Sequence, residues 1–193
     1  MKFVVSSNTL LTRLQAVSKV IGGKPVQPIL DNILLVATEG VLYATASDKE
    51  TTMEARIELE RLEEEGKITI PAKILLDILK EFPEQPLTFE INTETNEVKI
   101  ISEKGEFSVP GESAEDYPIQ AALNDSSNDL TSKCGLILEG IVKTIFATAN
   151  DDLRPVMNCI LIEMNEDNFT FVAYKRNFDI GSANINTYSL CHL

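Results

Sequence analysis

The sequence predicts an α+β fold with antiparallel sheets and a repeated unit. Three observations support this prediction. Short segments of alternating apolar and polar residues are separated by turn residues, as in an antiparallel sheet with one buried face. Two longer segments repeat apolar residues every three or four positions, as helices do. A helix, a proline corner and a strand in the first half of the chain also recur in the second half.

The first unit begins with a strand and a helix. The alternation from Lys2 to Val5 predicts the strand, and Ser7 or Asn8 can then cap a helix that carries an apolar stripe as far as Ile21. Gly22 and Gly23 are expected to end this helix, because glycine readily takes the positive φ of a helix C-terminus.

The remainder of the first unit alternates strands with one more helix. The acidic run from Glu63 to Gly66 is interpreted as a solvated turn, and Pro71 opens the second helix because proline suits a first helical turn. The other expected strands span residues 29–36, 41–47, 53–59, 67–70, 87–91, 98–102 and 107–109.

A shift of 127 positions aligns the two halves of the chain. Aligned pairs include Leu11 with Leu138, Pro28 with Pro155, Leu34 with Leu161 and Ala46 with Ala173. The match ends after residue 173, and residues 174–193 show no alternation. We therefore expect a first domain over residues 1–122, a polar linker over 123–129, an incomplete second domain over 130–173 and a divergent tail over 174–193.

Composition excludes several classes of site. Cys134, Cys159 and Cys191 have no C-x-x-C spacing and His192 is the only histidine, so we expect neither a zinc site nor a disulfide framework. We expect no cofactor either. The sequence has no signal-peptide pattern and no apolar run long enough for a membrane span, which predicts a soluble cytoplasmic protein. The net charge of −13 argues against nucleic acid unless basic residues gather on one face.

The stretch "IGGKPVQPIL" raises the question of a phosphate-binding loop around Lys24. Pro25 follows the lysine where a nucleotide-binding loop needs Ser or Thr, so the alternative of a rigid corner between helix and strand is favoured. The carboxylate pairs Asp151–Asp152 and Glu115–Asp116 suggest a hydrolase, but no histidine or activated nucleophile accompanies them. We assign no catalytic residue.

Several segments carry a family resemblance: "MKFVVSSNTLLTRLQAVS", "GGKPVQPILDNILL", "ASDKETTMEARI", "ITIPAKILLDILKEFP", "GEFSVPGESAEDYP" and "FATANDDLRPVMNCILIEM". In this order they resemble the bacterial DNA polymerase III β subunit, the sliding clamp, over residues 1–173. The resemblance implies the DNA clamp fold, with repeated domains whose sheets lie outside and whose helices line the inner face of a ring. It also implies a non-catalytic processivity factor that forms a ring-shaped homodimer around double-stranded DNA. Its further partners are the polymerase III catalytic subunit and the clamp loader.

The resemblance also implies roles for individual residues. The expected DNA contacts are Lys24 and Lys73, followed by Arg13, Lys19 and Lys80. On the residues alone, a rigid corner is the alternative for the Lys24 segment, and ordinary solvent-exposed side chains of helices are the favoured interpretation of the other four. Part of a groove for partner peptides is assigned to Arg154 and Met157. Half of a subunit contact is assigned to Lys104, Glu106, Phe107 and Val109 on an edge strand.

The chain departs from the clamp pattern near its end. Tyr174 and the residues after it replace an Ala-Thr-Asp-x-His-Arg-Leu type stretch, and Cys159 stands where a glycine is usual. A reading-frame error, a truncated copy or a real variant would each explain the tail. The third clamp domain is expected to be absent, so a non-functional or self-associating fragment, acting at most as an interaction module, is the alternative to a working clamp.

Overall fold

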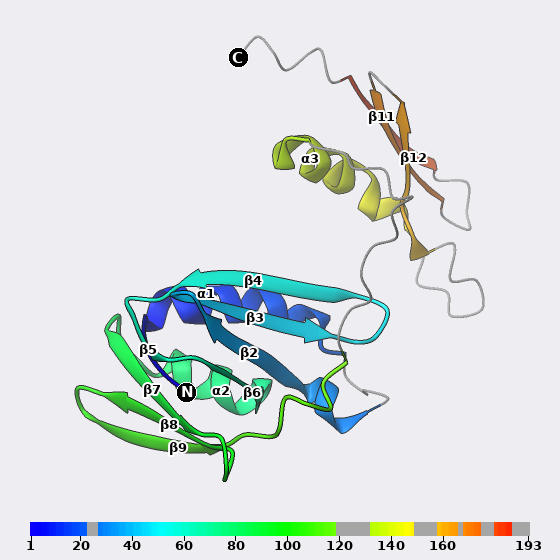
Figure 1. The fold of residues 1–193 in the computed structure, drawn as a ribbon. Helices are drawn as coiled ribbons and strands as arrows, with labels where there is room; N and C mark the ends of the chain where they lie inside the picture. The colour runs from blue at the N-terminus through cyan, green and yellow to red at the C-terminus, as the bar shows by residue number, and fades with distance from the viewer. Residues whose placement is uncertain (23–26, 119–131, 149–157, 166–167, 175–179, 187–193) are drawn as a thin grey trace. The chain divides into compact units, whose positions relative to one another are not determined.

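The computed structural model of the chain describes residues 1–22, 27–118, 132–148, 158–165, 168–174 and 180–186 (Figure 1). It divides into two compact units, Met1–Ala122 and Leu123–Leu193. Among the described residues, no helix has the length and apolar character needed to cross a membrane.

The first unit contains two antiparallel sheets. One has the strand order β5-β1-β7-β8-β9 and the other β4-β3-β2-β6. The strands of the first sheet are β1 (Lys2–Ser6), β5 (Arg61–Glu64), β7 (Pro86–Asn92), β8 (Glu97–Ser102) and β9 (Gly105–Pro110). Those of the second are β2 (Asn32–Thr38), β3 (Val41–Ser47), β4 (Thr52–Glu58) and β6 (Gly66–Pro71).

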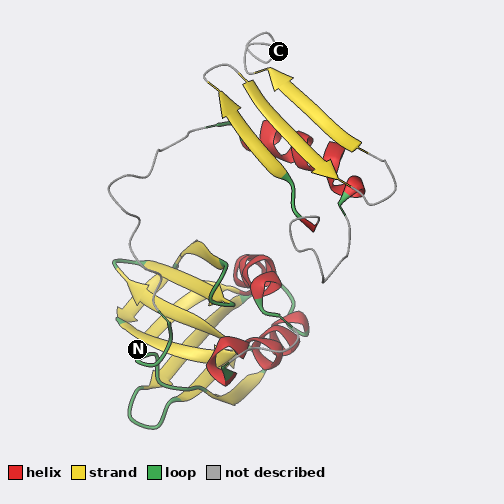
Figure 2. Cartoon of the chain, turned by 90° about the vertical axis from the view of Figure 1, so that its right-hand side faces the viewer, coloured by secondary structure: helices red, strands yellow, loops and turns green. Residues whose placement is uncertain are grey.

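Two helices complete the first unit and lie together on one side of its strands (Figure 2). They are α1 (Ser7–Val17), which continues as the 3₁₀ helix η1 (Ser18–Val20), and α2 (Ala72–Lys80); a second 3₁₀ turn, η2, spans Pro28–Asp31. The helices bury Leu10, Leu14, Leu75 and Leu79 in one core with side chains from both sheets. This apolar burial is the main source of stability for the unit.

The start and the end of α1 differ from the sequence-based expectation. The N-cap is Ser6, whose Oγ accepts a hydrogen bond from the Thr9 amide at 3.5 Å. Ser7 is instead the first helical residue. Its hydroxyl donates a hydrogen bond to the Pro83 carbonyl at 2.8 Å and accepts one from the Gln85 amide at 3.0 Å, which joins the helix to the segment before β7. The α-helical part ends at Val17 rather than at the glycine pair.

The acidic run is solvent-exposed, as expected, but the interpretation of it as a turn was wrong. Glu63 and Glu64 belong to β5, which pairs with β1. The Lys2 ammonium lies 3.0 Å from the Glu63 carboxylate, and Glu65 accepts from the Glu39 amide at 2.8 Å. The hydrogen bond from Lys2 lowers the pKa of Glu63 below its usual value. Cationic partners on the neighbouring strand therefore allow a charged sequence to form a strand.

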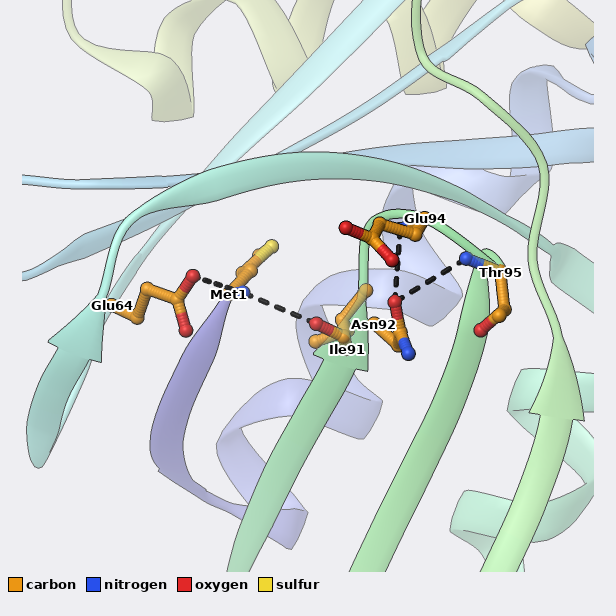
Figure 3. Close-up of polar contacts among 6 residues, drawn as sticks. All are labelled: Met1, Glu64, Ile91, Asn92, Glu94 and Thr95. Atoms are coloured by element: carbon orange, nitrogen blue, oxygen red, sulfur yellow. Dashed lines mark hydrogen bonds and ion pairs between the residues drawn. The ribbon is translucent and has the colours of Figure 1, made fainter.

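The start of β1 and the turn between β7 and β8 are held by polar contacts (Figure 3). The buried Met1 amino group donates to the Ile91 carbonyl at 3.1 Å and forms an ion pair with Glu64 at 3.2 Å. The Asn92 side chain accepts from the amides of Glu94 and Thr95 at 2.9 and 3.3 Å, which closes the turn. These contacts fix the register of the central strands of the sheet.

The second unit repeats part of the first. Its described elements are α3 (Cys134–Thr144), the 3₁₀ helix η3 (Ile145–Ala147), β10 (Leu161–Asn165), β11 (Asn168–Tyr174) and β12 (Ile180–Asn186), and its sheet has the order β10-β11-β12. The bounds of α3, η3 and β11 lie 127 positions after those of α1, η1 and β3. The three strands thus correspond to β2, β3 and β4.

Strand β12 lies in the segment to which the sequence analysis assigned no regular element, and it corrects that reading. β12 begins 128 positions after β4, so the connection before it is one residue longer than its counterpart in the first unit. A comparison at a fixed shift of 127 therefore loses the alternation at this point. The repeat continues into the tail.

Candidate nucleic-acid interface

Two of the predicted basic residues lie on one side of α2. Lys73 and Lys80 are both exposed, and they line a hollow together with Asp77 of the same helix and Ser18 and Ile21 of the first helical segment. Their spacing of seven residues returns the side chain to the same side of a helix after two turns. The buried residues Leu75 and Leu79 hold the opposite side of α2 against the sheets.

An acidic residue that the sequence analysis did not weigh interrupts this basic side. The Lys80 ammonium lies 3.0 Å from the Asp77 carboxylate, and both side chains are about half exposed, at 51% and 58%. The spacing of three residues between them was readable from the sequence, because residues three or four apart are neighbours on a helix. Lys80 is therefore partly neutralised, whereas no ion pair with Lys73 occurs in the described part of the chain.

The basic residues of the first helical segment separate into two places. Lys19 is exposed on η1, next in the chain to Ser18 of the α2 hollow. Arg13 is also exposed but lines a different hollow, together with Arg56, Glu58 and Glu60. The structure therefore does not bring Arg13 together with Lys73 and Lys80.

Three predicted site residues lie outside the described residues: Lys24, Arg154 and Met157. The same holds for Asp151 and Asp152 of the hydrolase alternative. Glu115 and Asp116 are exposed in the segment after β9. Within the described ranges, no three His, Cys, Asp or Glu side chains lie close enough to hold a metal ion.

The residues assigned to a subunit contact lie on or beside β9, which is an edge strand of its sheet. Phe107 is 44% exposed and packs edge-to-face on Phe82 with ring centroids 5.3 Å apart. Glu106 forms an ion pair with Lys99 at 3.2 Å. Val109 is 1% exposed and belongs to the core, while Lys104 lies in the turn before the strand. The open edge and the Phe107 ring are thus the accessible features here.

The segment after β9 is anchored by Tyr117. Its hydroxyl points to the carbonyls of Asn32 and Thr45, at 3.5 and 3.3 Å. Burial raises the pKa of the Tyr117 phenol, because the ionised form would lose its hydration. Tyr117 thus connects the segment after β9 to β2 and β3.

Comparison with known proteins gives one consistent family. The family model described as DNA polymerase III beta subunit, N-terminal domain, matches residues 1–122. The beta sliding clamp of Vibrio cholerae is 34% identical over 175 residues, which is 90% of this chain and 47% of the relative. That of Synechococcus elongatus is 31% identical over 176 residues, covering 90% and 46%. The chain thus spans about half the length of these relatives.

Solved structures agree with this assignment. The crystal structure of the DNA polymerase III subunit beta from Pseudomonas aeruginosa superposes with a TM-score of 0.86 and 27% identity, covering 96% of this chain and 50% of the other. A DNA polymerase III beta subunit structure from Eubacterium rectale gives a TM-score of 0.84 at 27% identity, with the same coverage. The expected α+β clamp fold is confirmed.

Proposed function

The chain belongs to the family of the bacterial DNA polymerase III β subunit, and we propose that it forms part of a sliding clamp, a non-catalytic ring that keeps the replicative polymerase on duplex DNA. Residues 1–122 act as the N-terminal clamp domain, and the second unit as the beginning of the central domain. The proposed location is the cytoplasm.

The observation that carries the proposal is the position of Lys73. It is an exposed lysine on α2, and α2 and α1 lie together on one side of the strands (Figure 2). A lysine meets phosphate as a point charge and does not read bases. Contacts of this kind hold a clamp near the duplex without stopping it from sliding. We propose the same role for Lys19, Lys80 and Lys24. Arg13 is the weakest of the five candidate DNA contacts, because acidic residues line the same hollow.

The remaining partners follow from the family. A second subunit would meet the open edge of β9 and the exposed Phe107 ring, because an edge strand offers unpaired backbone groups. Arg154 and Met157 would contribute to a groove for peptide motifs of the polymerase catalytic subunit and the clamp loader. Both contacts involve the whole clamp, of which this chain spans about half.

The test is binding of the full chain to labelled duplex DNA, followed by fluorescence anisotropy at several salt concentrations. Lys73→Glu is compared with Lys67→Glu, which makes the same charge change at an exposed lysine on β6. We expect Lys73→Glu to weaken binding equally for two unrelated sequences and to lower the slope of log K against log salt by about 0.9. Equal effects of the two substitutions, or unchanged binding at low and moderate salt, would remove Lys73 from the interface.

A further inference from the structure

The turn between β8 and β9 lacks the backbone conformation that usually holds a tight hairpin. Glu103 and Lys104 form a two-residue turn between the paired ends of the strands. Hairpins of this length favour turns with positive φ, because the twist of such a turn matches the twist of the strands. The turn between β2 and β3 has φ of 51° at Glu39 and 78° at Gly40, whereas neither Glu103 nor Lys104 has a positive φ. The β8–β9 turn therefore depends on contacts beyond its own backbone.

Gln85 supplies such a contact from the connection between α2 and β7 (residues 81–85). The residue is only 8% exposed, and its Oε1 accepts a hydrogen bond from the Glu103 amide at 3.3 Å. Within the hairpin itself, the Ser102 hydroxyl donates to the Gly105 carbonyl at 2.9 Å. The Gln85 side chain thus ties the turn to a segment 18 residues earlier in the chain.

The backbone of Gln85 is fixed to the start of α1. The Ser7 amide donates to the Gln85 carbonyl at 2.9 Å, and the Gln85 amide donates to the Ser7 hydroxyl at 3.0 Å. The same hydroxyl donates to the Pro83 carbonyl at 2.8 Å, and Ser7 is 2% exposed. Because both backbone groups of Gln85 are bonded to Ser7, its side chain reaches the turn from a fixed point on the helical side of the unit.

The same connection also contacts the edge strand that follows the turn. Phe82 packs edge-to-face on Phe107 of β9 with ring centroids 5.3 Å apart. β9 pairs with β8 on one side and has no strand on the other. After β9, the Gly111 amide donates to the Asn96 carbonyl at 2.8 Å. The far end of the strand is thus anchored separately, and its near end takes its position from the turn and from residues 81–85.

We propose that Gln85 is a positioning residue for the subunit contact at β9. It holds the β8–β9 turn to the start of α1, and so fixes Glu106 and Phe107 relative to the helices proposed to face DNA. The inference rests on the proposed role of β9 as a subunit contact. Without the hydrogen bond to Glu103, the hairpin opens more often, and an edge that is less ordered pairs less well with a partner strand.

The test is hydrogen–deuterium exchange of the full chain, labelled with ¹⁵N and followed by NMR. Gln85→Leu keeps a side chain of similar size and removes the acceptor. We expect exchange of the β9 amides bonded to β8 to rise by about fivefold to tenfold, the effect of one lost hydrogen bond. Exchange of the β2 amides is expected to stay unchanged. The matched control is Gln15→Leu, the same change at an exposed position of α1, which should leave β9 as it is.

A second variant separates positioning of the hairpin from general stability. Glu103→Asn together with Lys104→Gly gives the turn residues that readily take a positive φ at both positions, so the hairpin no longer needs outside support. In this background, Gln85→Leu is expected to leave exchange in β9 unchanged.

Three results would overturn the proposal. They are unchanged exchange in β9 after Gln85→Leu, an equal rise in β2, and a rise in β9 that persists in the chain with the replaced turn. Exchange is measured without a partner, so each result is independent of whether a second subunit meets β9.

Discussion

Neutralising Asp77 is expected to strengthen DNA binding, and the size of the effect follows from the geometry of α2. The exposed side of the helix carries Lys73 and Lys80 and, between them, Asp77 paired with Lys80 at 3.0 Å. Asp77→Asn removes the negative charge and releases the Lys80 ammonium. Because both side chains of the pair are about half exposed, its loss costs less than about 1 kcal/mol of folding stability.

The gain in DNA binding is a matter of one phosphate contact. A lysine that newly neutralises one phosphate adds about 0.9 to the slope of log K against log salt. Between about 50 and 200 mM salt, that slope corresponds to an additional change of about threefold to fourfold in affinity. We therefore expect Asp77→Asn to bind duplex DNA more tightly at low salt and to lose affinity more steeply as salt rises.

The assay is anisotropy of a labelled duplex over a salt series. Glu94→Gln makes the same charge change in the turn between β7 and β8 (Figure 3), where Glu94 is exposed and is not among the residues that line the α2 hollow. If the two variants shift the affinity and the salt slope equally, only the net charge matters and the assignment of the α2 side to DNA is wrong. Thermal unfolding of both variants should stay close to that of the parent chain.

Two further predictions concern stability. Gly140→Ala should destabilise the second unit, because the new Cβ would lie 2.3 Å from the fully buried Phe171 ring, and overpacking of about 1–3 kcal/mol exceeds the helix-propensity gain of about 1 kcal/mol. Gly135→Ala should not destabilise the unit, because its new Cβ would meet nothing within 4 Å. Equal urea midpoints of the two variants, measured by circular dichroism, would contradict the overpacking at Gly140. Tyr117 has a raised pKa, so its contribution to the stability of the first unit is present below pH about 10 and lost as the pH rises through that raised value. Tyr117→Phe should reduce this loss of stability at alkaline pH, whereas Tyr43→Phe should not. An unchanged loss in Tyr117→Phe would refute the assignment of the loss to Tyr117.

The parts of the fold that the sequence analysis found are those with strong periodicity. The apolar stripes of α1 and α2 and the alternation in β2 and β3 reflect burial on one side, which the sequence records directly. β5 was missed because the acidic run suggested a solvated turn, and the partners of its two glutamates, Lys2 and the Met1 amino group, are far away in the sequence. Tertiary ion pairing of this kind leaves no local pattern.

The candidate site also combines features that the sequence pattern predicts with features that depend on tertiary contacts. The common side of Lys73 and Lys80 follows from helical spacing, and the nearby Asp77 was readable by the same rule. The acidic residues near Arg13 could not be predicted in this way, because Glu58 at the end of β4 and Glu60 after it line the same hollow as Arg13 only through tertiary packing. Sequence spacing thus locates charges along one helix, while the balance of charge at a surface depends on what the fold brings beside it.

The extra residue before β12 shows where a duplicated unit tolerates a change in length. An insertion inside β11 would turn every following side chain to the other face of the sheet, whereas the same insertion in the connection leaves the strand faces intact. With the added residue allowed for, Ala55 and Ile57 of β4 align with Ala183 and Ile185 of β12. The two copies therefore differ in length in the connection between two strands and keep the same apolar positions within the strand.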